Sequence, residues 1–208
     1  MAVAILDYGM ANLRSVQKAL ARVGAEAQII TKPEQIDAAD RLVLPGVGAF
    51  RDAIDTLRQR HLDVAIARHI QRSKPFLGIC LGLQMLFDVG YEDGEHRGLG
   101  ILRGKCVRFD VDQTMHLKVP HMGWNQLTQH NPTPLLTGVP AGACVYFVHG
   151  YHVVPDDASV IATTTDYGRP FVSSVRRGEL YATQFHPEKS QKIGLKILAN
   201  FAGCTFDL

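Results

Sequence analysis

The chain has 208 residues, 46% hydrophobic and 20% charged, and its 22 lysines and arginines against 20 aspartates and glutamates leave a formal net charge of +2. This length and composition predict a globular chain with a sizeable core and exclude a disordered one. The near-neutral charge excludes a broad basic surface for nucleic acid or for an anionic membrane. The apolar runs are far shorter than the roughly 20 residues of a spanning helix. With no signal-peptide pattern at the N-terminus, we expect a cytoplasmic protein without a membrane segment.

Short apolar runs alternate with longer amphipathic stretches in the first half, which is the pattern of βαβ units and a mostly parallel sheet. We expect strands at residues 2–6, 27–30, 41–44 and 75–79. The first helix should begin after Asn12 as its N-cap and run to about residue 23. Further helices are expected over residues 53–57, 62–70 and 81–89.

The second half consists of shorter β-rich pieces separated by Gly, Pro and Asn, a texture that suits antiparallel hairpins. The expected strands are residues 101–109, 144–154, 160–165, 171–175 and 179–184, with a turn at 176–178 and a final helix over 191–202. No linker or repeat divides the sequence. We therefore predict one domain over residues 1–208, a three-layer flavodoxin-like α/β fold with a mostly parallel central sheet and an antiparallel β extension.

The strongest chemical signal is the segment Gly78-Ile79-Cys80-Leu81-Gly82, which joins an apolar strand to a helical pattern. A nucleophile on such a turn has a strained backbone, and glycines two residues to either side relieve the crowding there. The N-terminus of the following helix favours the reactive thiolate. Cys80 is therefore a candidate nucleophile; the alternative is a buried structural cysteine between packing glycines.

A candidate base lies in Phe185-His186-Pro187-Glu188, directly after an expected strand. Residues two apart in an extended segment face the same side, so Glu188 can hold the imidazole of His186. We predict that His186 takes and returns a proton and that Glu188 orients it. Alone, the segment could be a polar turn that caps the last helix, but the cysteine turn at another strand end favours a triad.

An oxyanion hole would complete such a site. We predict the amide of Leu81 as one donor, and the loop at residues 45–48 as the source of a second, through Val47 or Gly48. The glycines of this loop permit the peptide geometry that would aim an N–H at the site. A tight strand-to-helix turn would need them too, and both interpretations can hold.

No metal or cofactor is expected. Histidines recur at short spacing in two places, His149 with His152 and His116 with His121, but no two of the four cysteines are close together, as structural zinc usually requires. The chain contains no Walker-type or G-x-G-x-x-G phosphate loop. The remaining cysteines are predicted to be small core residues: Cys106, Cys144 and Cys204.

The Pro-Gly-Val-Gly loop, the cysteine turn and the His-Pro-Glu segment, in this order, resemble the class I (triad) glutamine amidotransferases. Three further segments resemble one group within that class, the glutaminase subunits of imidazole glycerol phosphate synthases of histidine biosynthesis. These segments are residues 7–16 (DYGMANLRSV), 119–125 (VPHMGWN) and 146–151 (YFVHGY). The resemblance spans nearly the whole chain.

The resemblance implies that Cys80 attacks the side-chain amide of glutamine, that ammonia leaves, and that water resolves a γ-glutamyl thioester to glutamate. It also implies a (βα)₈-barrel cyclase partner, which uses the ammonia to form imidazole glycerol phosphate and an aminoimidazole carboxamide ribotide. We further hypothesise that the loop at residues 45–48 turns an amide toward the oxyanion only when the partner is loaded.

The same positional match implies the binding residues. Gln84 and Glu92 would contact the α-amino and carboxylate ends of glutamine; taken alone, they read as a solvated helix residue and a surface charge. The pocket would be completed by Gly46 and by backbone near His149, Gly150 and Tyr151. Five residues would lie toward the partner: Asn12, Lys118, Trp124, Tyr146 and Lys189.

Two positions depart from the usual pattern: Ala11 replaces a common glycine, and Gly150 a small hydroxyl residue, so that Gly150 offers backbone only. Three alternatives remain open. One is a stand-alone cysteine γ-glutamyl hydrolase or peptidase on a similar fold, against which Gln84 and the subunit-specific segments argue. The others are a glutaminase of another ammonia-using synthase and an inactive regulator, the last disfavoured by the intact triad.

Overall fold

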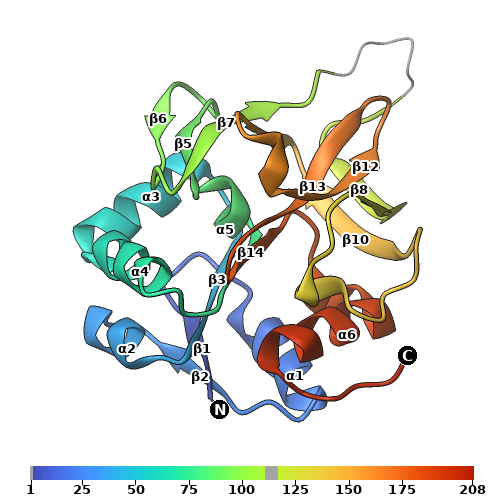
Figure 1. Cartoon of the computed structure of the whole chain (residues 1–208). Helices are drawn as coiled ribbons and strands as arrows, with labels where there is room; N and C mark the ends of the chain where they lie inside the picture. The colour runs from blue at the N-terminus through green and yellow to red at the C-terminus, as the bar shows by residue number, and fades with distance from the viewer. Residues whose placement is uncertain (1, 111–116) are drawn as a thin grey trace.

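The computed structural model describes residues 2–110 and 117–208. His116, one of the closely spaced histidines, lies outside them. Five parallel strands form one part of the main sheet, in the order β2-β1-β3-β4-β14 (Figure 1). They are β1 (Val3–Leu6), β2 (Ala27–Ile30), β3 (Arg41–Gly46), β4 (Phe76–Cys80) and β14 (Leu180–Thr183). This order is the 2-1-3-4-5 order of flavodoxin-like folds, so the predicted fold class is confirmed.

Helices cover both faces of the parallel strands (Figure 1). One face packs against α1 (Leu13–Arg22) and α6 (Gln191–Ala202), and the other against α2 (Pro33–Ala38), α3 (Phe50–Gln59) and α4 (Leu62–Gln71). Alternate residues of each strand point to opposite faces. In β1, Val3 and Ile5 therefore join the core under α1 and α6, whereas Ala4 and Leu6 join the other core.

Antiparallel strands extend the main sheet beyond β14, in the order β13-β11-β7-β5-β6, although β5 runs parallel to β7. Their bounds are β5 (Phe87–Gly90), β6 (His96–Arg97), β7 (Leu102–Arg108), β11 (Tyr151–Pro155) and β13 (Pro170–Arg177), with β12 (Ile161–Asp166) and β9 (Thr128–Gln129) alongside. A separate hairpin-like pair joins β8 (His121–Gln126) to β10 (Cys144–His149). The short helical pieces are α5 (Leu81–Gln84), η2 (Pro134–Leu136), η3 (Ala158–Val160) and η4 (Pro187–Lys189).

The helix predicted over residues 81–89 is wrong in its second half. Helix α5 ends at Gln84, and β5 follows from Phe87. Local periodicity cannot separate a short apolar helix from a buried strand, and the pairing of β5 with β7 decides between them. Gly90 permits this arrangement, because a β-carbon there would lie 2.8 Å from the ring of Phe50.

The single strand predicted over residues 144–154 is two strands in different sheets. The chain leaves β10 at His149, and β11 begins at Tyr151, so Gly150 is the point at which it passes from the small sheet to the main one. The cysteine predictions are correct only in part: Cys106 is buried, but Cys204 is half-buried and Cys144 is exposed.

The start of α1 also differs from the prediction. The helix does follow Asn12, but the Asn12 side chain makes no capping hydrogen bond to a backbone amide. Its Oδ1 instead accepts a hydrogen bond from the Ser15 hydroxyl at 2.9 Å. Strand β8 and helix α2 were not predicted, since β8 has mixed polarity and α2 is only a turn and a half long. Among the described residues, no helix is long and apolar enough to cross a membrane.

Candidate active site

Three loops meet at the carboxyl edge of the parallel strands. The register pairs Gly46, at the end of β3, with Cys80, at the end of β4, and it pairs Thr183 of β14 with Ile79. The chain that leaves β3, β4 and β14 therefore emerges at one place, where open α/β sheets bind their ligands. The Pro-Gly-Val-Gly loop, the cysteine turn and the His-Pro-Glu segment follow these three strands.

Cys80 has the strained backbone expected of its turn, with φ 55° and ψ −108°. The flanking glycines allow the close packing that holds it: a β-carbon on Gly82 would overlap the carbonyl oxygen of Leu44, and one on Gly78 would lie 2.8 Å from the carbonyl oxygen of Gly82. The thiol is 7% exposed, and its Sγ lies 3.9 Å from the carbonyl oxygen of Val148. The Gln184 amide donates to the same sulfur at 3.6 Å.

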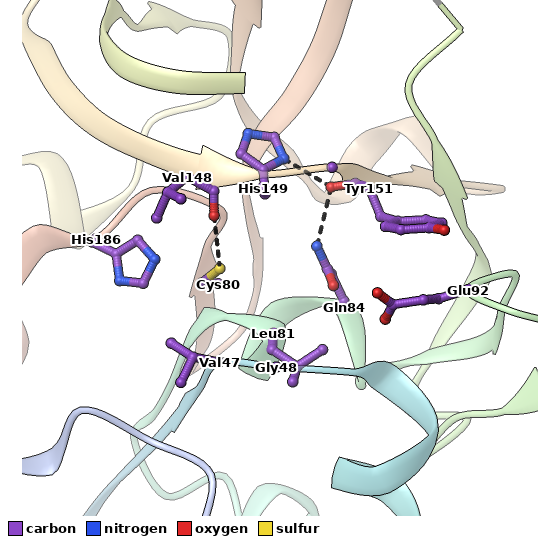
Figure 2. Close-up of a pocket in the computed structure, with 11 residues that line it drawn as sticks. Val47, Gly48, Cys80, Leu81, Gln84, Glu92, Val148, His149, Tyr151 and His186 are labelled. Atoms are coloured by element: carbon purple, nitrogen blue, oxygen red, sulfur yellow. Dashed lines mark hydrogen bonds between the residues drawn. The ribbon is translucent and has the colours of Figure 1, made fainter. Parts of the chain in front are cut away.

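His186 and Glu188 form a buried pair beside this thiol. The imidazole Nδ1 lies 2.8 Å from Glu188 Oε1, and both side chains are 2% exposed. Because a carboxylate only accepts, Nδ1 carries the proton, and Nε2 is left for Cys80. Nε2 has no hydrogen-bond partner among the described residues, and His186 and Cys80 line the same cavity (Figure 2). Burial lowers the pKa of His186, but its interactions with Cys80 and Glu188 outweigh burial and raise that pKa to about 10.

Backbone contacts fix the position of this pair. The amide of His186 donates to the carbonyl oxygen of Tyr146 at 2.9 Å. The Ser190 hydroxyl donates to the carbonyl oxygen of His186 at 2.7 Å and accepts from the amide of Tyr146 at 2.9 Å. Helix α6 approaches so closely that a β-carbon on Gly194 would overlap the carbonyl of Pro187. Strand β10 and helix α6 therefore hold η4 from two sides.

A cavity of about 240 Å³ opens above Cys80. It is lined by Val47, Gly48, Cys80, Leu81, Gln84, Glu92, Val148, His149, Gly150, Tyr151 and His186. Figure 2 shows His186 and Cys80 toward one end of the cavity and Glu92 toward the other. Of the predicted pocket residues, Gly46 alone is outside this lining; it packs against Leu81 and the hydroxyl of Tyr8 instead.

Gln84 and Glu92 are held in place by specific hydrogen bonds. Gln84 is 6% exposed, and its Nε2 donates both to the carbonyl oxygen of Tyr151 and to Gln184 Oε1, each at 3.1 Å. Glu92 Oε2 accepts from the amide of Phe50, in the first turn of α3, at 2.7 Å. Gln84 is therefore not a solvated helix residue, and Glu92 is more than a surface charge.

In the oxyanion loop, the amide of one candidate donor points away from the cavity. The amide of Val47 donates to the carbonyl oxygen of Met10 at 2.9 Å, so it is not directed at the cavity in this structure. Leu81 and Gly48 do line the cavity. A donor role for Val47 therefore requires its peptide to turn away from Met10.

Comparison with known proteins identifies the family. The family Glutamine amidotransferase class-I matches residues 4–203.

The chain belongs to the class-I glutamine amidotransferases.

Among the relatives of this amidotransferase is the "Imidazole glycerol phosphate synthase subunit HisH" of Syntrophotalea carbinolica, which is 54% identical over 96% of this chain and 98% of its own. The protein of the same name from Aquifex aeolicus is 53% identical over 97% of this chain and 96% of its own. Among solved structures, "Structure of PurLQS from Thermotoga maritima" aligns with a TM-score of 0.75 at 18% identity, covering 97% of both chains. The last likeness shows the shared fold.

Sequence reasoning missed two residues of the amidotransferase site. Gln184 is fully buried and contacts both Cys80 and Gln84, and the one available signal was its place directly before the His-Pro-Glu segment. Tyr8 is buried behind the oxyanion loop, where a β-carbon on Gly46 would lie 2.6 Å from its hydroxyl. Burial, followed by the charge of Cys80, raises the pKa of Tyr8 far above its usual value.

Three of the five predicted partner-facing residues lie together. Trp124 and Tyr146 are register partners on β8 and β10, with ring centroids 6.1 Å apart, and Lys189 Nζ lies 5.8 Å from the centroid of the Tyr146 ring. Trp124 is 48% exposed and its neighbour Met122 is 63% exposed. Asn12 and Lys118 are also exposed; Asn12 Oδ1 accepts from the Ser15 hydroxyl, and the Lys118 carbonyl oxygen accepts from the Tyr167 hydroxyl.

Glu188→Gln should destabilise the fold in a pH-dependent way. The pKa of His186 is raised in the folded chain, so its charged pair with Glu188 stabilises fully below the unfolded value of about 6.5 and is lost as the pH rises toward 10. Urea unfolding of wild type and variant should therefore differ most near about pH 6 and converge at alkaline pH. A difference that stays constant across this range would contradict the charged pair.

Proposed function

We propose that this chain is the glutaminase subunit of an imidazole glycerol phosphate synthase in histidine biosynthesis. The relatives at 53–54% identity over nearly the full length carry that subunit name. The structural observation that carries the proposal is the cavity itself. It has the Cys80 thiol and the His186 imidazole toward one end, and Gln84 and Glu92 along the way to the other. This arrangement suits an amino acid whose side-chain amide must reach the thiol.

The geometry supports a thioester mechanism. Because the pKa of His186 is raised, its Nε2 holds the proton of Cys80 at neutral pH, and the thiolate attacks the amide carbon of glutamine. His186 then gives the proton to the departing nitrogen, so that ammonia leaves and a γ-glutamyl thioester remains. With His186 as base, water attacks the thioester carbonyl, which releases glutamate and restores the Cys80 thiol. Glu188 keeps Nδ1 protonated and stabilises the imidazolium throughout.

Two kinds of donor would hold the oxyanion of the tetrahedral intermediate. The amide of Leu81 lies at the start of α5, directly after the nucleophile. The second donor would be the amide of Val47 or of Gly48, after the peptide of Val47 turns from Met10 toward the cavity. Until that turn occurs, one part of the oxyanion hole is incomplete.

A (βα)₈-barrel cyclase subunit is the proposed partner and ammonia acceptor. The face that carries Met122, Trp124, Tyr146 and Lys189 supports this placement, because exposed aromatic and sulfur-containing side chains are enriched in interfaces. The same face lies next to the site, since the backbone of Tyr146 bonds to His186 and Ser190. Asn12 and Lys118 are proposed to extend this surface. With a net charge of only +2, docking would rest on shape and specific contacts.

The free chain should be a slow glutaminase that its partner activates. Because the amide of Val47 is bonded to Met10, we expect glutamine hydrolysis by the free chain to be about 10² to 10³ slower than in the loaded complex, the usual cost of one oxyanion donor. Steady-state glutamate release with and without the cyclase measures this ratio. Equal rates would instead identify a stand-alone hydrolase.

Cys80→Ala should separate the two half-reactions. Glutamine-dependent synthesis by the complex should be abolished, because no thioester can form, whereas synthesis from added ammonium salt should continue at the wild-type rate. Cys204→Ala is the matched control and should keep both activities. Loss of the ammonia-dependent activity in Cys80→Ala would mean that the cysteine is needed for the structure of the complex.

A further inference from the structure

Two buried histidines play no part in the mechanism above: His149 lines the cavity, and His121 lies behind it. His121 of β8 and His149 of β10 are register partners and are 3% and 5% exposed. His121 Nδ1 lies 3.3 Å from His149 Nε2. They lie in the segments 119–125 and 146–151 of the sequence.

The partners of these rings define where each proton lies. His149 Nδ1 is 2.8 Å from the carbonyl oxygen of Tyr151, which can only accept, so Nδ1 carries the proton. Nε2 of the neutral ring must then accept from Nδ1 of His121, and His121 Nε2 is left to accept from Asn125 Nδ2 at 3.4 Å. Every donor thus points along the chain toward Tyr151.

The surroundings keep both rings neutral and out of water. His121 stacks on Tyr167 and Phe147, with centroids 4.0 and 4.9 Å away, and His149 packs against Phe109 at 5.1 Å. Burial lowers the pKa of His149 to about 3 and that of His121 to about 4. A neutral ring has one donor and one acceptor nitrogen, which is what this chain of hydrogen bonds requires.

The chain of bonds ends at a substrate-facing side chain. The Tyr151 carbonyl that accepts from His149 also accepts from Gln84 Nε2 (Figure 2). The second hydrogen of Gln84 Nε2 goes to Gln184 Oε1. Both amide hydrogens of Gln84 are therefore used. Its carbonyl oxygen remains available on the side of the cavity, where it offers an acceptor and no donor.

We propose that His121 and His149 are positioning residues for glutamine binding, which hold the Tyr151 carbonyl and so orient Gln84 with Oε1 as the acceptor for the ammonium group of glutamine. The inference rests on the proposed glutaminase function and adds a reason why the site would accept the ammonium group of glutamine. Without His149, the carbonyl oxygen of Tyr151 loses one of the two groups that donate to it. This part of the cavity wall, which fixes the Gln84 amide, is then free to move. The effect falls on substrate binding and leaves the thioester chemistry of Cys80 in place.

The test is the kinetics of glutamine hydrolysis by the complex with the cyclase. His149→Leu should raise KM for glutamine about tenfold, the loss expected for a hydrogen bond that leaves a buried acceptor unpaired, with kcat changed less than about twofold. His149→Asn should restore most of the affinity, because its amide nitrogen reaches the position of Nδ1. His121→Leu should raise KM by a smaller factor, because it removes the donor to His149 Nε2 but leaves the hydrogen bond from His149 Nδ1 to Tyr151.

His152→Leu is the matched control. His152 packs against the same Phe109, with centroids 4.8 Å apart, but its Nδ1 has no hydrogen-bond partner within the described residues and it is not part of the chain of bonds. Its KM should equal that of wild type. If His149→Leu and His152→Leu change KM alike, or if neither changes it, the inference is wrong. A wild-type complex that hydrolyses no glutamine would instead overturn the proposed function.

A spectroscopic measurement distinguishes positioning from general packing. Nitrogen-15 NMR of the histidine-labelled complex should show His121 and His149 as neutral rings protonated at Nδ1. In His121→Leu the Nε2 resonance of His149 should shift, because Nε2 loses its donor, whereas Nδ1 should stay protonated on the Tyr151 carbonyl. A His149 ring protonated at Nε2 in the wild type would overturn the inference, because the bond to Tyr151 could not then form.

Discussion

The parallel pairing of β4 with β3 on one side and β14 on the other is the constraint on which the site depends. It sets Gly46 opposite Cys80 and Thr183 opposite Ile79. Residues far apart in the sequence therefore reach one edge without any long loop. The glycines of the cysteine turn follow from this constraint, because the backbone of α5 must pass directly against Leu44 of β3. This packing on both sides holds Cys80 in its strained backbone conformation.

The pair of strands β8 and β10 contacts the segment that follows β14 at that edge. Its outer side chains, Trp124 and Tyr146, are those available to a partner, while the backbone of Tyr146 bonds directly to the segment that carries His186. At one end of the same pair, His149 lines the cavity and His121 contacts His149 from behind. A partner bound to this pair of strands would contact elements that position both His186 and the wall of the cavity.

The sequence predicted the contact of His186 with Glu188 because its geometry is local. The two-residue spacing of His186 and Glu188 sufficed to predict a contact that the structure shows at 2.8 Å. What sequence reasoning missed depends on distant partners. The direction of the Val47 amide is set by the Met10 carbonyl, the strand β5 by its pairing with β7, and the division at Gly150 by the choice between two sheets. The contacts of Gln184 with Cys80 and of Tyr8 with Gly46 likewise depend on strand ends that only the fold brings together.

The most direct test of the account is the site of covalent labelling by a glutamine analogue that carries an electrophile in place of the amide. After incubation with the complex and proteolysis, mass spectrometry should find one label per chain, on Cys80, and an excess of glutamine should prevent it. Cys106, Cys144 and Cys204 serve as internal controls and should remain unmodified. A label on any other residue, or labelling of Cys80 that glutamine does not suppress, would contradict the assignment of Cys80 as the nucleophile of a glutamine site.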